Sequence, residues 1–216
     1  METKHTELIC ILDKSGSMAG LESDTIGGFN TLIAKQKKEI GEVIVTTVLF
    51  DTYYTIVHNR IPLQAVKPLS EKEYSVGGLT ALLDAVGTTI DLIHVNIEKG
   101  EYKEYPSVMV VIITDGMENS STNYTLPMVK KNIEYNKEMY NWEFIFLGAN
   151  IDAFQAAQSL GISKDRASSF HADKTGVSIN FSVVSESVSQ IRRGKGIDPR
   201  WKDKIEKDFE SRKKIN

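Results

Sequence analysis

Cysteine and long apolar runs are scarce in this sequence of 216 residues. Cys10 is the single cysteine, which excludes an internal disulfide, and its place in the first apolar run predicts a small buried thiol in a reducing compartment. The first residues lack the basic region, long apolar stretch and cleavage site of a secretory signal, and every apolar run is too short to span a bilayer. We therefore expect a soluble, cytoplasmic protein that makes no membrane contact.

Several motifs that mark common enzyme and cofactor classes are also missing. The chain has neither Gly-x-Gly-x-x-Gly after its first predicted strand nor Gly-x-x-x-x-Gly-Lys, so nucleotide binding of those two kinds is not indicated. Neither Ser15 nor Ser17 sits in Gly-x-Ser-x-Gly, which argues against a serine hydrolase. The histidines, none of them at a metal-ligand spacing, are His5, His58, His94 and His171.

Charge is divided unevenly along the chain. The net charge is -3, but residues 192–216 carry ten Lys or Arg against five Asp or Glu, which is +5 and leaves -8 for the remainder. A basic tail can contact RNA, DNA or an acidic partner. Because both signs are interspersed here, we favour a solvated helix and expect no nucleic acid partner.

Apolar runs of strand length alternate with segments of helical period, which predicts an α/β fold with a mainly parallel sheet. Ile26, Phe29, Ile33 and Ile40 trace one helix face after Asp24, its predicted N-cap. A short helix follows Asp152, and other helices are expected at 81–97, 126–140 and 175–191. Predicted strands are 8–13, 43–50, 53–61, 108–114, 143–147 and 168–171, of which 53–61 pairs antiparallel with its predecessor at the sheet edge.

Two glycines, Gly194 and Gly196, mark a boundary after the last domain helix. We expect one domain over residues 1–193 and a charged tail over 194–216. A helical tail is compatible with its sequence, and the sequence leaves open whether that tail packs on the domain.

Oxygen-bearing side chains gather where predicted parallel strands end. Asp13, Ser15 and Ser17 follow the first strand, Asp115 ends the strand 108–114, and Thr80 follows a glycine loop. Ligands bind beyond the carboxyl ends of such strands, where the strand order reverses. Two carboxylates on neighbouring strand ends would raise each other's pKa unless a cation lay between them. Carboxylates and hydroxyls suit Mg²⁺, Mn²⁺ or Ca²⁺ better than zinc.

Taken in order, Asp13-x-Ser15-x-Ser17, Thr80 after Gly-Gly-Leu, and Thr114-Asp115-Gly116 after an apolar strand resemble the metal-ion-dependent adhesion site of von Willebrand factor type A domains. The resemblance covers about residues 7–191. It implies a doubly wound, Rossmann-like sheet of six strands with one antiparallel edge strand and helices on both faces.

The resemblance also implies roles for these residues. Ser15, Ser17 and Thr80 would ligate through hydroxyls, and Asp13 and Asp115 directly or through water. No motif position departs from the family pattern, which implies an intact site. With five protein ligands, an octahedral ion keeps one position for water or for a partner's Asp or Glu carboxylate.

Other readings compete at single positions. Thr80 is equally suited to cap the following helix. Glu118 and Asn119 either line the rim of the site or lie in a solvated loop. Asn150 and Asp152 leave the next strand at the same sheet edge, where we favour a capping role for Asp152 over contact with a partner.

These observations predict a non-enzymatic, metal-dependent protein-binding module, a scaffold or adaptor. The family resemblance suggests a bacterial or phage complex, with AAA+ ATPases or stress-response and phosphorylation modules as partners. One alternative is a Mg²⁺-dependent phosphatase with Asp13 as nucleophile, although Ser15 stands where such enzymes usually have a second Asp. Another is an RNA-binding protein of the same family that uses the basic tail.

Overall fold

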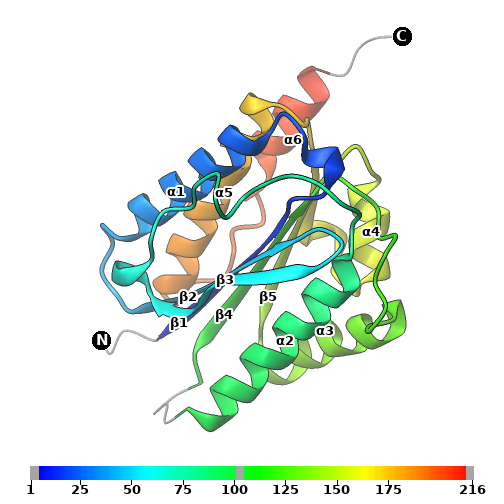
Figure 1. The fold of residues 1–216 in the computed structure, drawn as a ribbon. Helices are drawn as coiled ribbons and strands as arrows, with labels where there is room; N and C mark the ends of the chain where they lie inside the picture. Colours follow the sequence, from blue (N-terminus) through cyan, green and yellow to red (C-terminus); the bar gives the residue numbers. More distant parts are fainter. Residues whose placement is uncertain (1–4, 101–104, 213–216) are drawn as a thin grey trace.

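A six-stranded sheet forms the centre of the computed structural model, which describes residues 5–100 and 105–212 (Figure 1). The strands lie in the order β3-β2-β1-β4-β5-β6, with β3 antiparallel to β2 and the other neighbouring pairs parallel. This confirms the predicted fold class, antiparallel edge strand included. The strands are β1 (Thr6–Asp13), β2 (Val43–Phe50), β3 (Tyr54–Pro62), β4 (Ser107–Thr114), β5 (Glu143–Ala149) and β6 (Ala167–Phe170).

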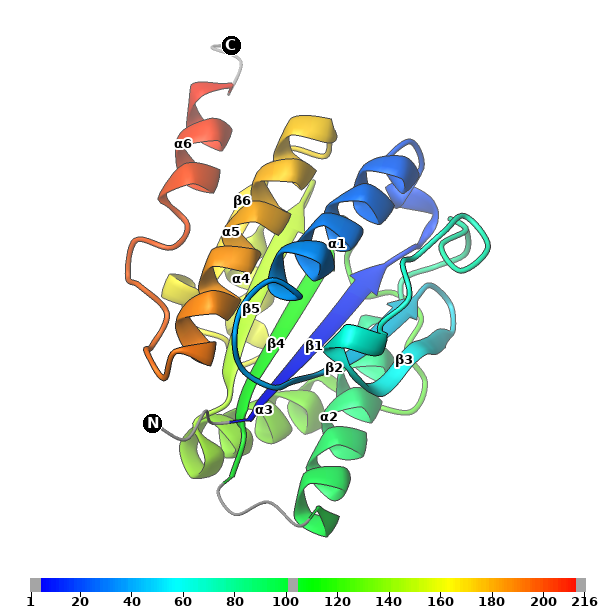
Figure 2. The ribbon, with the colours of Figure 1, turned by 90° about the vertical axis from the view of Figure 1, so that its left-hand side faces the viewer.

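Helices cover both faces of the sheet. Figure 2 shows α1 and α5 side by side in front of it, with α6 next to α5, while α2, α3 and α4 pack on the opposite face. None of the helices in the described residues has the length and apolar character needed to cross a membrane. The helices are α1 (Glu22–Gln36), α2 (Leu82–Lys99), α3 (Leu126–Tyr140), α4 (Ala153–Ser159), α5 (Lys174–Arg192) and α6 (Asp203–Ser211), with 3₁₀ turns η1 (Gly16–Met18), η2 (Leu63–Ala65) and η3 (Lys164–Arg166).

Strand β1 lies at the centre and is buried on both faces. Its side chains alternate, so that Leu8, Cys10 and Leu12 face the α1/α5 layer while Ile9 and Ile11 face the α2/α3 layer. Cys10 is buried, as predicted, and burial raises the pKa of its thiol to about 12. The chain runs outward from β1 to β3 and then from β4 to β6, so the strand order reverses between β1 and β4.

Two details of the first helix differ from the sequence prediction. Helix α1 begins after Leu21, and Asp24 lies inside its first turn, so Asp24 is not the N-cap. The helix ends at Gln36, and the turn that follows contains Gly41 with a φ of +112°. Ile40 is therefore off the helix and 91% exposed, although its spacing continues the apolar face.

The charged tail packs on the domain through three apolar side chains spaced four residues apart. Ile197, Trp201 and Ile205 are buried in the core cluster that includes α1 and α5, and the Trp201 indole N–H donates to the Asp165 carbonyl at 2.7 Å. Part of the tail is helical, as α6, and residues 213–216 lie outside the described residues.

The loop that follows β4 is held against α2 by a buried carboxylate. Asp84 in the first turn of α2 accepts the backbone N–H groups of Thr122, Asn123 and Tyr124 at 2.8 to 2.9 Å. Burial by itself would raise the pKa of Asp84, but these hydrogen bonds outweigh burial and hold the pKa below its usual range. The charged form of Asp84 thus fixes the loop.

Helices α1 and α5 approach closely at a glycine. A Cβ built on Gly28 would lie 2.2 Å from the Phe181 ring of α5, whereas one on the adjacent Gly27 meets no atom within 4 Å. We predict that Gly28→Ala lowers the unfolding free energy by roughly 1–3 kcal/mol through overpacking. Gly27→Ala, the matched control, should leave stability unchanged or raise it by up to about 1 kcal/mol. Urea unfolding would measure both, and equal effects of the two variants would contradict this packing.

A second prediction concerns Asp84. A carboxyl with a lowered pKa contributes stability above its ordinary pKa of about 3.9 and loses that contribution as the pH falls through the lowered value. Asp84→Asn should therefore cost about 1–2 kcal/mol at pH 7, and the deficit should shrink toward pH 3. Urea unfolding at both pH values, with exposed Glu71→Gln as the control, measures this. A deficit that stays constant with pH would refute the role given to the charge.

Candidate functional site

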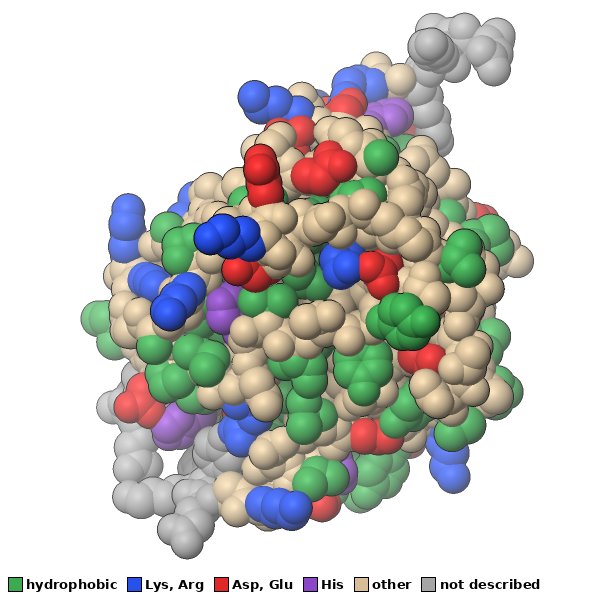
Figure 3. Space-filling model, viewed as in Figure 1, with side chains coloured by type: hydrophobic (Ala, Val, Ile, Leu, Met, Phe, Trp, Pro, Cys, Tyr) green, Lys and Arg blue, Asp and Glu red, His purple; other side chains and the backbone are tan. Residues whose placement is uncertain are grey.

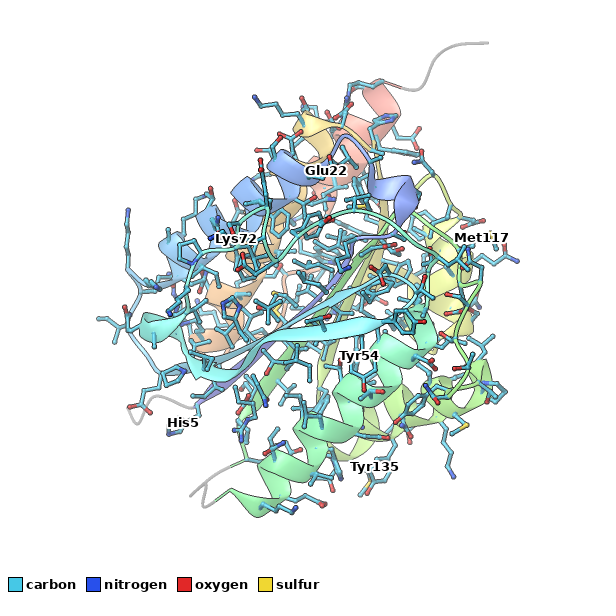
Figure 4. The ribbon with its side chains drawn as sticks, viewed as in Figure 1. His5, Glu22, Tyr54, Lys72, Met117 and Tyr135 are labelled. Atoms are coloured by element: carbon cyan, nitrogen blue, oxygen red, sulfur yellow. The ribbon has the colours of Figure 1, made fainter. Side chains whose placement is uncertain are left out.

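The site lies where β1 and β4 end side by side. These strands are parallel neighbours with Leu12 opposite Ile113, so Asp13 at the end of β1 and Asp115 just after β4 come to the same edge of the sheet. The predicted proximity of the two carboxylates is confirmed. In Figure 4, the labelled Glu22 and Met117 mark the two segments that leave this edge, after β1 and after β4.

The carboxylate of Asp13 is fully buried and held on both oxygens. Its Oδ1 accepts the Ser15 backbone N–H at 2.7 Å, and its Oδ2 accepts the Thr114 hydroxyl at 2.5 Å. The Tyr74 hydroxyl donates to the backbone carbonyl of Asp13. Burial raises the pKa of Asp13, and the hydrogen bonds from Thr114 and Ser15 offset only part of that rise.

The second carboxylate is incompletely satisfied. The Ser17 hydroxyl donates to Asp115 Oδ1 at 2.5 Å, and the Ser15 and Ser17 hydroxyl oxygens lie 3.2 Å apart. Asp115 Oδ2 is buried and has no hydrogen-bond partner among the residues that the structure describes. Burial raises the pKa of Asp115 as well. A buried carboxylate oxygen without a partner is costly, so Asp115 Oδ2 favours a proton or a cation beside it.

Thr80 comes to the same place from the loop before α2. A Cβ built on Gly116 would lie 2.8 Å from Thr80 Oγ1 and 3.2 Å from Ser17 Oγ, so both hydroxyls border this glycine. Thr80 is 3% exposed. Helix α2 has Ala81 at its N-cap position, so the alternative reading of Thr80 as the helix cap is wrong. The structure thus brings together the whole predicted set, which is Asp13, Ser15, Ser17, Thr80 and Asp115.

Backbone hydrogen bonds tie the loop after β1 to the loop before α2. Gly16 N–H donates to the Gly78 carbonyl at 3.1 Å, and Gly77 N–H donates to the Lys14 carbonyl at 2.9 Å. Gly78 has a φ of +73°, where a side chain would be strained. The loop geometry therefore requires this glycine and fixes the distance between Thr80 and the Asp13 loop.

Asn119 and Glu118 join the loops of the site through hydrogen bonds. Asn119 exchanges two hydrogen bonds with the Thr80 backbone, at 2.9 Å through its Oδ1 and at 3.0 Å through its N–H. Glu118 accepts the Leu83 N–H at 2.8 Å and three donors from Ser120 and Ser121. Both residues lie in the loop after β4, where Asn119 is exposed and Glu118 is half-buried, and both are hydrogen-bonded within the protein.

The sequence interpretation assigned no role to Thr114 and Tyr74, both of which hold Asp13. Thr114 belongs to the Thr114-Asp115-Gly116 motif, so the sequence indicates its place at the site but not its hydrogen bond to Asp13. Tyr74 comes from a segment without regular structure and gave no signal. At the neighbouring strand end, Asp152 caps α4 by accepting the Gln155 N–H at 3.0 Å, as predicted, and Asn150 is exposed with a φ of +53°.

All donors that converge here are oxygens. Over residues 5–100 and 105–212 there is no cluster of three or more His, Cys, Asp or Glu side chains that could hold a metal ion. A metal at this edge would instead be held by two carboxylates and three hydroxyls, which is a donor set for hard divalent cations. Lys14, the nearest cation in sequence, pairs with Asp51 on the β2–β3 turn.

No protein-family model and no curated protein matches the sequence. Solved structures do match. A von Willebrand factor type A protein from Catenulispora acidiphila is 13% identical with a TM-score of 0.60, over 87% of this chain and 43% of that one. Proximal thread matrix protein 1 of the mussel byssus, with zinc in its MIDAS motif, is 13% identical with a TM-score of 0.59, over 85% and 46%.

Manganese-loaded TRAP protein of Plasmodium vivax is 17% identical with a TM-score of 0.54, over 83% of this chain and 74% of that one. This chain spans less than half the length of the first two solved chains. Identities this low show the fold and nothing finer. The chain has the α/β fold of von Willebrand factor type A domains.

Proposed function

We propose that this chain is a protein-binding module that depends on a divalent metal ion and recognises an acidic side chain of its partner. The observation that carries the proposal is that two buried carboxylates and three hydroxyls lie together at one edge of the sheet, where Asp115 Oδ2 has no hydrogen-bond partner among the described residues. A dication bound there would supply that oxygen with its partner and relieve the desolvation of both carboxylates.

The charge balance explains why binding would be conditional. Asp13 and Asp115 together can neutralise one dication, and the hydroxyls add no charge. Five protein oxygens leave an octahedral ion at least one position for water or for an incoming carboxylate. We propose Mg²⁺ as the resident ion, with Mn²⁺ or Ca²⁺ as alternatives. Zinc and manganese in the two solved structures with related folds support a divalent ion in general.

Apolar side chains around this polar centre support protein binding over catalysis. Tyr53 on the β2–β3 turn is 78% exposed, and Leu79 beside Thr80 is 53% exposed. Met117, two residues after Asp115, is 74% exposed. Exposed apolar groups that surround a polar centre mark interaction surfaces. The phosphatase alternative has less support, because Ser15 replaces the expected second acid and the Lys14 ammonium is paired with Asp51.

The alternative of RNA binding through the tail is also less well supported. In the described part of the tail, Lys204 pairs with Glu186 at 2.7 Å, Lys202 pairs with Glu206 at 2.9 Å, and Arg212 bridges two aspartates. Cations engaged in this way are poorly placed to neutralise phosphates. We propose that the module acts as a cytoplasmic scaffold or adaptor in a bacterial or phage complex, in company with AAA+ ATPases or stress-response and phosphorylation modules.

The proposal predicts that metal stabilises the fold. Mg²⁺, Mn²⁺, Ca²⁺ and Zn²⁺ would each be added to chelator-treated protein, and an ion at 100 times its Kd should add about 2.7 kcal/mol to the unfolding free energy. For a domain of this size that is a rise in Tm of roughly 5–10 °C by differential scanning calorimetry.

The variant Asp115→Asn sharpens the test because it keeps the shape and removes the charge. Without metal it should be at least as stable as the wild type, since a buried amide costs less than a buried carboxylate. Added metal should not raise the unfolding free energy of Asp115→Asn. It should raise that of Asp24→Asn on α1, the control, as much as that of the wild type. If no ion stabilises the wild type, or if Asp115→Asn gains as much as the wild type, the proposal fails.

A further inference from the structure

An apolar groove of about 320 Å³ opens beside the proposed metal site. One wall is the first turn of α2 together with the loop after β4, and the other is the segment that leads into α4 and α4 itself. The volume is at the lower end of the range for ligand pockets, which suits a large side chain rather than a cofactor. Its apolar lining includes Leu82, Leu83, Met117, Leu126, Ile151 and Leu160.

The groove and the proposed metal site share a residue. Gly116 lines the groove. It also borders the two hydroxyls of the site, because a Cβ built on it would lie 2.8 Å from Thr80 Oγ1 and 3.2 Å from Ser17 Oγ. The next residue, Met117, is 74% exposed. It stands at the outer rim in Figure 4, where the same view in Figure 3 shows green hydrophobic side chains at the surface. A segment bound over Asp115 would continue directly into the groove.

The walls of the groove are already fixed. Glu118 accepts the Leu83 N–H at 2.8 Å and the Ser121 hydroxyl at 2.7 Å, which joins the loop after β4 to α2. Asp152 accepts the Gln155 N–H at 3.0 Å and caps α4. Both acids of the lining are therefore engaged within the protein, and most of the remaining lining is apolar, with Gln155 and Ser159 as its other polar side chains. A preformed apolar groove binds without an ordering cost of its own.

We propose that this groove is the second half of the binding surface and takes a large apolar side chain, Leu, Ile, Met or Phe, of a protein partner. That side chain lies one or two residues from the Asp or Glu that completes the metal. Gly116, which lines the groove, directly follows Asp115, and an extended segment advances about 3.3 Å per residue, so neighbouring residues of one segment can occupy both places. The inference rests on the proposed function.

Acidic side chains are common on protein surfaces, so a metal–carboxylate bond alone selects poorly among partners. The groove supplies the specificity that this bond lacks.

The test is selection from a displayed random-peptide library on the immobilised full chain with Mg²⁺, with elution by a chelator. We expect eluted peptides to carry Asp or Glu with Leu, Ile, Met or Phe within two positions. Replacing that apolar residue by Ser in a selected peptide should weaken binding about tenfold or more, as should Met117→Ser in the protein. Met128→Ser on α3 is the matched control, because Met128 is 48% exposed and outside the groove lining, and it should change affinity less than about twofold.

The outcomes separate the two claims. If chelator-eluted peptides share an acid but no apolar neighbour, or if Met117→Ser binds a selected peptide like the wild type, the groove assignment is overturned and the metal-dependent function stands. If peptides bind the groove equally well without metal, or if no peptide binds, the proposed metal-dependent function is contradicted. The inference, which rests on that function, is then contradicted as well. Circular dichroism of both Met→Ser variants confirms that folding is unchanged.

Discussion

Two buried carboxylates at the ends of adjoining parallel strands are the constraint on which the rest of this site depends. Asp13 and Asp115 reach the same edge because β1 and β4 are adjacent parallel strands, and the strand order reverses between these two strands. Burial raises the pKa of both, and only one oxygen of Asp115 finds a hydrogen bond among the described residues. Such an arrangement is stable either with protons or with a cation. The glycine loops, the Asn119 contacts with Thr80 and the Glu118 hydrogen bonds all serve to keep three hydroxyls beside these two acids.

Much of this arrangement could be predicted from the sequence, because it follows from local pattern. The β-branched run 108–114 has the composition of a strand covered on both faces, and polar residues directly after such strands are brought to one edge by parallel pairing. What the pattern could not show were contacts made by residues distant in sequence. The Thr114 hydroxyl on Asp13 and the Asn119 bridge to Thr80 depend on the tertiary fold. Periodicity also misled at Ile40, because it continues past the turn in which the helix ends.

The tail illustrates the same limit. Its interspersed charges of both signs predicted a solvated helix, yet Ile197, Trp201 and Ile205 are buried against the domain, and charged side chains such as Lys204 pair at the surface. The spacing of these three apolar residues, four apart in a charged segment, is the sequence signal that this part of the tail packs against the domain. The hydrogen-bonded loops and the groove between α2 and α4 make the sheet edge a preorganised surface, so binding selectivity would come from the groups it already presents rather than from rearrangement.

The most direct measurement of the central claim is a crystal structure of the protein soaked with Mn²⁺, located by its anomalous scattering. The account predicts one ion at the edge of the sheet, with oxygens of Asp13, Ser15, Ser17, Thr80 and Asp115 around it, each binding at about 2.1 Å or through one water. A protein that binds no ion there at millimolar Mn²⁺, with Asp115 Oδ2 protonated or hydrogen-bonded to another protein group instead, would contradict it.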